Sequence, residues 1–499
     1  MNFLDKDIKK SVFISSVVII LILTLASCIY PKYIGDSCLT FQNSISENLG
    51  WFFIFSVGLI LIISFVLAFS KFGNIKLGAN DSKPEFSNLS WFSMLFSAGM
   101  GIGLMFWGVS EPIIHFINPP IPDKNTINVA KDAIKISFFH WGINVWGIYS
   151  LFAVMLSYFG YRKNLPLLPR SILYPIIDEK IHGRIGDYVD IFAILGTLFG
   201  MCTSMGLGAM QINAGLSYLF PIPQNLYVQI IIIALVTFLA TISLVCGLEK
   251  GIKNLSNINI ILAFLLMSLI LVLGDTVNLL SYFIQNLAEY FSDIIYRTFN
   301  MYAYRKDNNW ISNWTLPYWA WWLSWAPFVA MFIARISKGR TIREFMVGVL
   351  FAPSLFTLLW MTIFGNSALG IIARGDGKEL IESATSNIPI VLFQFLNNFE
   401  FSLALQIISI VLIITFFVSS SDSASYVIDT ISFGGNSKNK KSYKIFWSVS
   451  AGVLASSLLI AGGLKTLQTI TIIGSLPILI IMIVGTYGFI KSLRKEFKK

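Results

Sequence analysis

The feature of this sequence that most limits its fold is a series of apolar stretches, each long enough to cross a lipid bilayer. A helix rises about 1.5 Å per residue, so about 20 apolar residues cover the roughly 30 Å of hydrocarbon in a membrane. The twelve stretches are residues 12–31, 51–70, 88–117, 136–160, 187–219, 226–248, 256–275, 314–337, 344–373, 401–432, 443–463 and 467–490. They predict an all-α membrane protein with twelve transmembrane helices.

The composition agrees with a chain whose main solvent is lipid. Hydrophobic residues make up 55% of the 499 positions and charged residues only 12%, so a soluble fold would lack polar surface. The net charge of +10 does not indicate nucleic-acid binding, because no basic run lies on a polar face. With both termini in the cytoplasm, the inward segments carry 26 of the 36 Lys and Arg residues. This asymmetry predicts a multi-pass protein of the cell inner (plasma) membrane with both termini cytoplasmic.

A linker without a span, residues 276–313, separates the first seven stretches from the last five, and residues 491–499 form a short basic tail. The further division into residues 1–87 with two N-terminal transmembrane helices, 88–275 with a first group of five and 314–490 with a second group of five is what the family resemblance given below implies. Between positions 278 and 297, apolar side chains share one helix face and polar side chains the other. We therefore expect an amphipathic helix in the linker, along the outer membrane surface or against the bundle.

The sequence offers no set of residues for covalent chemistry. No nucleophile, base and orienting group occur together, and the four cysteines show no metal-ligand spacing. We expect a protein that is not an enzyme and that has no cofactor, disulfide framework or zinc site.

Aromatic side chains crowd the eighth stretch, which reads WTLPYWAWWLSWAPF from position 314. On a helix turning about 100° per residue, five of them lie within about 100° of arc. These are Trp314, Tyr318, Trp321, Trp322 and Trp325. Alone, such a stripe is as consistent with an interfacial Trp and Tyr belt as with a binding site.

A second aromatic set in the fourth stretch favours a binding site. In FFHWGINVWGIYS, the rings of Trp141, Trp146 and Tyr149 share one side of a helix, well inside the apolar run. Two aromatic faces on separate spans can enclose a weakly hydrated cation, because each π face attracts it by about 0.5–2 kcal/mol. A quaternary ammonium group fits best.

No unpaired acidic residue is expected among these rings to serve as a counter-ion. Asp422 and Asp429 lie in the tenth stretch, and Glu111 lies near the end of the third. A bare cation would thus lack a fixed counter-ion, whereas a zwitterion brings its own carboxylate. This favours a betaine as the ligand. His140, beside Trp141, is a candidate proton carrier, although a lone histidine near a span end is more often simply hydrogen-bonded.

Glycines interrupt the third stretch, in GMGIGLMFWG from Gly99 to Gly108. Each mid-helix glycine costs about 1 kcal/mol relative to alanine, which permits local unwinding. Amides freed in this way could receive a carboxylate, as helix N-termini do. Close helix packing through small residues explains the glycines equally well.

Hydroxyl groups gather in the tenth stretch, in FFVSSSDSASY from Ser419 to Ser425. Hydroxyl and carbonyl oxygens are hard ligands that suit Na⁺, and the costly intramembrane Asp422 adds to that interpretation. Serine hydroxyls that bond to their own helix carbonyls are the simpler explanation for any single residue.

Together these motifs resemble the betaine/carnitine/choline transporter family, and most closely its sodium-coupled glycine betaine transporters. The motifs are GMGIGLMFWGVSEP (99–112), HWGINVWGIY (140–149), RKNLPLLPRSILYP (162–175), the tryptophan-rich segment 314–345 and FFVSSSDS (416–423). The resemblance implies two inverted five-helix repeats of the kind found in sodium-coupled amino-acid symporters, a midplane site, alternating access and a homotrimer.

The resemblance also assigns site residues. The substrate positions that it implies are Trp141, Trp146, Tyr149 and Trp322 as an aromatic box, Trp321 and Trp325 on the path, and the segment with Gly99, Met100, Gly101 and Gly103. The sodium positions are Ser97, Met100, Ser419 and Ser420 in one site and Thr203, Ser204 and Phe328 in a second. Choline carriers of the family often have an acid where Gly103 stands, which agrees with a zwitterionic substrate.

The sequence therefore predicts an osmoprotective importer of glycine betaine or a close relative, driven by sodium symport. Its expected partners are this small solute, the sodium ion, membrane lipid and further copies of the chain. Proton-coupled choline uptake and carnitine/betaine exchange remain alternatives within transport. A non-transporting receptor for quaternary ammonium compounds is the alternative from another class.

Overall fold

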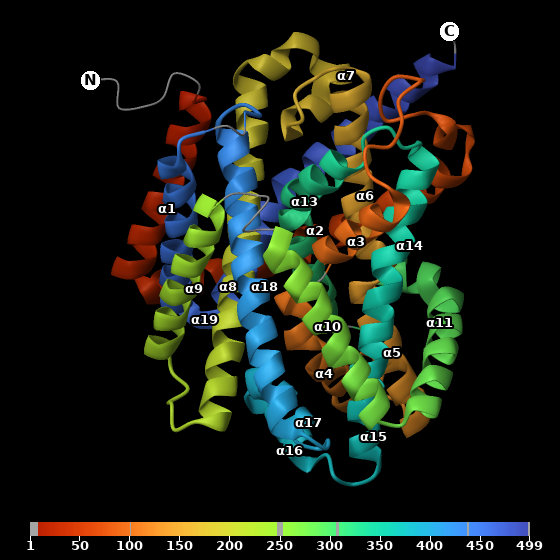
Figure 1. The fold of residues 1–499 in the computed structure, drawn as a ribbon, viewed down its shortest axis with the longest axis vertical. Helices are drawn as coiled ribbons and strands as arrows, with labels where there is room; N and C mark the ends of the chain where they lie inside the picture. The colour runs from red at the N-terminus through yellow and green to blue at the C-terminus, as the bar shows by residue number, and fades with distance from the viewer. Residues whose placement is uncertain (1–7, 100, 247–252, 306–308, 437–438, 498–499) are drawn as a thin grey trace.

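The computed structural model describes residues 8–99, 101–246, 253–305, 309–436 and 439–497. Over these ranges the protein is helical, and the only β-type pairing in them is an isolated antiparallel bridge between Lys76 and Thr341. Figure 1 shows α8, α9 and α18 side by side on one flank and α11 beside α14 on the other.

The helices follow one another along the chain with short connections. Up to the linker they are α1 (Lys10–Ile29), α2 (Pro31–Phe69), α3 (Asn88–Gly99), α4 (Ile102–Ile117), α5 (Thr126–Trp141), α6 (Ile143–Ser157), α7 (Tyr174–Ile177), α8 (Arg184–Leu219), α9 (Leu226–Cys246) and α10 (Lys253–Leu273). From the linker on they are α11 (Thr276–Phe299), α12 (Trp310–Asn313), α13 (Thr315–Ile336), α14 (Ile342–Met361), α15 (Ser367–Ala373), α16 (Lys378–Ser386), α17 (Val391–Leu396), α18 (Ser402–Ser432) and α19 (Lys441–Glu496). The π-helical turns η2 (Tyr158–Arg162) and η6 (Thr362–Asn366) extend α6 and α14.

The apolar stretches of the sequence coincide with helices, but not always with one helix each. In the described ranges, nine helices are long and apolar enough to cross a membrane. The third stretch is divided between α3 and α4, and the last two stretches are joined in α19, which bends at Gly462 and Gly463. The eighth stretch forms α13, which is 22 residues long and rich in Trp.

The fourth stretch is also divided, between α5 and α6 at Gly142. A Cβ at this position would lie 2.5 Å from the carbonyl oxygen of Phe138 and 2.7 Å from the hydroxyl of Tyr290. That hydroxyl accepts a hydrogen bond of 3.1 Å from the amide of Ile143, so a residue of α11 satisfies the first amide of α6. The break sets the direction of Trp141, the last residue of α5.

Helix α11 is the amphipathic helix of the linker, and it packs against α5. Its polar side faces α5, because Lys135 lies 3.8 Å from Glu289 and 3.6 Å from Asp293. Two apolar residues of the helix, Ile284 and Ile295, are 71% and 76% exposed. The helix therefore contacts the bundle through ion pairs and leaves much of its apolar side uncovered in this chain.

The centre of the molecule is formed around α13. This helix packs against α6, α8 and α19, and α14 packs against α6. Four members of the aromatic stripe of α13 are buried, and the most exposed of them, Trp322, is only 8% exposed; Trp314, at the start of the helix, is partly buried. The stripe thus lies inside the helix bundle and is not an interfacial belt.

Candidate functional site

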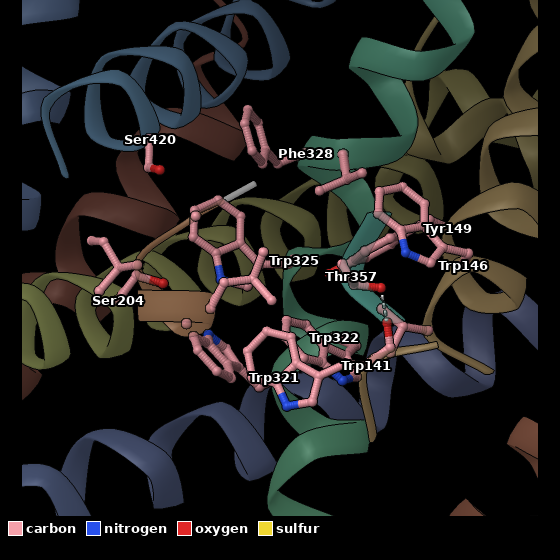
Figure 2. Close-up of a pocket in the computed structure, with 16 residues that line it drawn as sticks. Trp141, Trp146, Tyr149, Ser204, Trp321, Trp322, Trp325, Phe328, Thr357 and Ser420 are labelled. Atoms are coloured by element: carbon pink, nitrogen blue, oxygen red, sulfur yellow. Dashed lines mark hydrogen bonds between the residues drawn. The ribbon is translucent and has the colours of Figure 1, made fainter. Parts of the chain in front are cut away.

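A cavity opens in the middle of the bundle, beside α13. It holds about 670 Å³ of empty space, part of which is open to the outside. Its walls come from α4, α5, α6, α8, α13, α14 and α18. Figure 2 shows the indoles of α13 pointing into the space, with Trp146 and Tyr149 on one side and Ser204 and Ser420 on the other.

The predicted aromatic residues meet at this cavity. The ring of Trp141 stands edge-on to Trp322, with 5.0 Å between centroids and 72° between planes. Trp322 stacks on Trp321 at 4.8 Å and 14°. Trp146 and Tyr149 form a second edge-to-face pair at 5.5 Å. All five rings line the cavity, as does Trp325, so π faces are available from α5, α6 and α13.

Hydrogen bonds hold two of these rings in place. The indole N–H of Trp322 donates to the carbonyl oxygen of His140 at 3.1 Å. The hydroxyl of Thr357, on α14, donates to the carbonyl oxygen of Trp141 at 2.9 Å. The end of α5 is therefore fixed to both α13 and α14, and the ring geometry is set before a ligand enters.

A carboxylate lies directly behind the rings, where sequence reasoning did not place one, although it is hydrogen-bonded and does not line the cavity. Glu111 accepts a hydrogen bond of 2.7 Å from the indole N–H of Trp141 and another from the hydroxyl of Tyr318. Sequence reasoning placed Glu111 near a span end and overlooked its partners on α5 and α13. The spacing of Glu111 and His115, one helical turn apart, was the available signal.

The glycine-rich segment is where α3 and α4 separate. Helix α3 ends at Gly99, α4 begins at Ile102, and Gly101 between them is extended and lines the cavity. The first amides of α4 thus begin at the wall of the cavity. Met100 lies outside the described residues, and of Ser97 only the helical backbone is described.

Two other glycines of this segment serve close packing. A Cβ on Gly103 would lie 2.5 Å from Cη2 of Trp141 and 3.0 Å from Cη2 of Trp321. A Cβ on Gly108 would lie 2.7 Å from Nε1 of Trp360. Both roles that the sequence left open for the glycines are therefore present, at different positions.

The candidate sodium residues are divided between different surroundings. Ser204, Phe328 and Ser420 line the aromatic cavity. Thr203 does not, because its hydroxyl donates to the carbonyl oxygen of Leu467 at 2.6 Å and its side chain lines a neighbouring cavity. The second sodium set implied by the resemblance is thus not gathered in one place.

Ser419 also points away from the aromatic cavity. Its hydroxyl accepts a hydrogen bond of 2.7 Å from the amide nitrogen of Asn259, on α10. The buried Oδ1 of Asn259 has no partner among the described residues, and sequence reasoning missed this residue. Asp422 is buried as well, and it accepts hydrogen bonds from Ser243 at 2.5 Å and Ser423 at 3.1 Å.

The neighbouring cavity lies on the other side of Trp321. Trp314 and Tyr318 line it, whereas Trp322 and Trp325 line the aromatic cavity, and Trp321 belongs to both. The aromatic stripe of α13 thus lines both the aromatic cavity and the neighbouring cavity, and Trp321 lies between the two.

Comparison with known proteins gives a consistent result. Residues 11–498 match the family described as "BCCT, betaine/carnitine/choline family transporter". A "Glycine betaine transporter" of Acinetobacter baylyi is 43% identical over 496 residues, which cover 99% of this chain and 74% of that protein. "Glycine betaine transporter OpuD" of Bacillus subtilis is 41% identical, over 98% of this chain and 96% of that protein. The "High-affinity choline transport protein" of Escherichia coli K12 is 39% identical, over 99% of this chain and 73% of that protein.

Proposed function

This chain belongs to the betaine/carnitine/choline family of transporters, and from that membership we propose that it imports glycine betaine or a close relative by sodium symport, for osmoprotection. The family and the relatives are transporters, so the chain is a multi-pass membrane transporter and not an enzyme. The receptor alternative is set aside for the same reason.

The proposal depends on one observation: aromatic rings from three helices line the same cavity. Trp141, Trp146, Tyr149 and Trp322 present rings to this one cavity, and several ring faces together suit a trimethylammonium group. In the proposed complex, the carboxylate of the betaine lies toward the first amides of α4, beside Gly101, where the helix dipole favours an anion. The neighbouring cavity beyond Trp321 would then belong to the permeation path.

Choline uptake is the second candidate, and a specific observation favours it. Glu111 supplies a carboxylate behind the rings, so a cation without its own anion no longer lacks a counter-charge. Choline carriers are also among the relatives, at 39% identity. The betaine proposal therefore depends on the relatives of higher identity and on the absence of an acidic side chain at Gly103.

The transport cycle that we propose is alternating access between two inverted five-helix repeats, in a protein with twelve spans, cytoplasmic termini and a homotrimeric assembly. One structural parallel supports the repeats. The second span of each group contains a π-helical segment, η2 at the end of the fourth stretch and η6 between α14 and α15 in the ninth. Such turns place irregular backbone in the corresponding span of each half.

Uptake by purified protein in liposomes tests the proposed function. With an inward sodium gradient, labelled glycine betaine is expected to accumulate above its external concentration, and replacement of sodium by potassium at fixed pH should abolish the accumulation. Unlabelled choline should compete more weakly than unlabelled betaine. Accumulation driven equally well by a proton gradient in potassium, with choline preferred, would transfer the proposal to proton-coupled choline uptake.

Replacement of Ser420 by alanine is expected to raise the sodium concentration for half-maximal uptake about fivefold or more, because Na⁺ would lose one oxygen ligand at the cavity wall. Ser419→Ala is the matched comparison, since its hydroxyl is engaged by Asn259 and its removal should have the smaller effect. A wild-type sodium response in Ser420→Ala would remove this residue from the proposed site.

A further inference from the structure

Glu111 is a fully buried carboxylate that collects four hydrogen-bond donors from three helices. One oxygen accepts from Trp141 Nε1 at 2.7 Å and from the hydroxyl of Tyr318. The other lies 2.7 Å from Nδ1 of His140 and 3.3 Å from Nε2 of His115. All of these side chains are buried. A buried anion is tolerated when its oxygens are satisfied in this way.

The hydrogen bonds indicate which tautomers the histidines adopt. Nδ1 of His140 carries the proton toward Glu111, so its Nε2, 3.1 Å from Thr315 Oγ1, accepts from that hydroxyl. Nε2 of His115 donates to Glu111, and its buried Nδ1 has no partner among the described residues. The described residues bring no Lys or Arg within ion-pair distance of Glu111. With both imidazoles neutral, these four donors leave Glu111 its net negative charge.

Two of the four donors belong to the aromatic cluster itself. Trp141 lines the cavity from α5, and Tyr318 of α13 stacks on Trp322 with 6.0 Å between centroids. Because Oε2 of Glu111 binds both Trp141 and Tyr318, a residue of α4 fixes the distance between the two aromatic faces. The hydrogen bond to the anion polarises the indole N–H of Trp141, so its hydrogen becomes more positive and electron density moves into the ring. The ring face that meets the ligand becomes more negative as a result.

We infer that Glu111 is a positioning residue for substrate recognition, which holds Trp141 and Tyr318 in register and places a negative charge behind the rings. This inference rests on the proposed function. The charge acts on any cation at the rings, so it contributes more to a net cation such as choline than to a zwitterion such as betaine.

Glu111, His115 and His140 are also residue types that bind metal ions, and their ligand atoms all lie within 4.8 Å of one another. The 2.7 Å between Oε1 of Glu111 and Nδ1 of His140 is a hydrogen-bond length. Two ligands about 2.0 Å from a tetrahedral zinc would lie about 3.3 Å apart. The geometry therefore points to hydrogen bonding.

The test compares choline with 3,3-dimethylbutanol, which replaces the ammonium nitrogen by carbon and is uncharged. Both compete with labelled glycine betaine for uptake by wild-type protein and by Glu111→Gln, a variant of the same shape without the charge. The wild-type protein should have a much lower inhibition constant for choline than for the uncharged alcohol. In Glu111→Gln the inhibition constant of choline should rise about tenfold more than that of the alcohol, and the KM for betaine should rise by an intermediate factor.

A matched control is Asp429→Asn, which neutralises a buried carboxylate of α18 that does not contact the rings. In this variant, the ratio of the inhibition constant of choline to that of 3,3-dimethylbutanol should equal the wild-type ratio. A folded, transporting Glu111→Gln with the wild-type ratio would overturn the inference while leaving the proposed function intact. Wild-type protein that accumulates neither betaine nor choline would instead overturn the proposed function.

Tyr318→Phe tests the positioning role if Glu111→Gln does not reach the membrane. It removes one donor and keeps the ring, so the KM for betaine should rise about threefold or more with little change in Vmax. An unchanged KM would overturn the positioning role. Stoichiometric zinc in the purified wild-type protein, with loss of uptake on chelation, would also overturn it in favour of a metal site.

Discussion

Replacement of Trp322 by leucine is expected to lower glycine betaine uptake about tenfold or more. The indole of Trp322 contacts both Trp141 and Trp321, at 5.0 and 4.8 Å between centroids, so its loss removes one π face and the support of two others. A tenfold loss corresponds to about 1.4 kcal/mol, which a cation–π contact of about 0.5–2 kcal/mol and the lost ring support together supply. Initial uptake of labelled betaine, normalised to protein in the membrane, measures the effect.

The control for this variant is Trp51→Leu. Trp51 is 59% exposed on α2 and does not line the aromatic cavity, so its uptake should match the wild type. Leucine keeps much of the apolar volume at position 322, and we expect both variants to remain in the membrane. Wild-type uptake by Trp322→Leu would mean that this ring does not recognise the substrate.

The second large loss of uptake is expected when Gly103 is replaced by alanine, which adds a single methyl group. In Gly103→Ala the new Cβ would meet the Trp141 ring at 2.5 Å; this ring is tethered to Glu111, and Thr357 holds the backbone carbonyl of Trp141. The ring must therefore shift into the cavity, and uptake should fall about tenfold or more, mainly through KM. An aspartate at this position, which the family resemblance links to choline, would demand the same shift.

Gly50→Ala is the matched control for the glycine variant. No atom lies within 4 Å of the Cβ that it would add to α2, and alanine favours a helix over glycine by about 1 kcal/mol. Uptake by Gly50→Ala should equal that of the wild type. Equal, undiminished uptake in both variants would show that the ring of Trp141 can move without loss of recognition.

The sequence predicted the helical class and the aromatic residues of the cavity, for a physical reason. Both are encoded locally: the length of apolar runs is set by the thickness of the bilayer, and the stripe of α13 by the turn of a single helix. Trp322 and Trp325 needed no knowledge of other helices to be placed on one face. The family comparison then identified the chain as a transporter.

Contacts between distant segments could not be predicted in this way. A continuous helix was assumed for the fourth stretch, yet α5 and α6 separate at Gly142, where Tyr290 of the linker helix occupies the space that a side chain would need and accepts from the amide of Ile143. Likewise, the partners of Glu111 lie 30 and 207 positions away in the sequence. Also hidden in the sequence was the hydrogen bond from the hydroxyl of Thr203 to the carbonyl oxygen of Leu467, 264 positions away.

The central claim is that these rings enclose a methylated nitrogen, and an experimental structure with bound glycine betaine tests it most directly. The account predicts that the nitrogen lies within about 6 Å of the ring centroids of Trp141, Trp146, Tyr149 and Trp322, with the carboxylate toward Gly101. A nitrogen bound elsewhere, with the aromatic cavity empty or filled by a shifted indole, would contradict it.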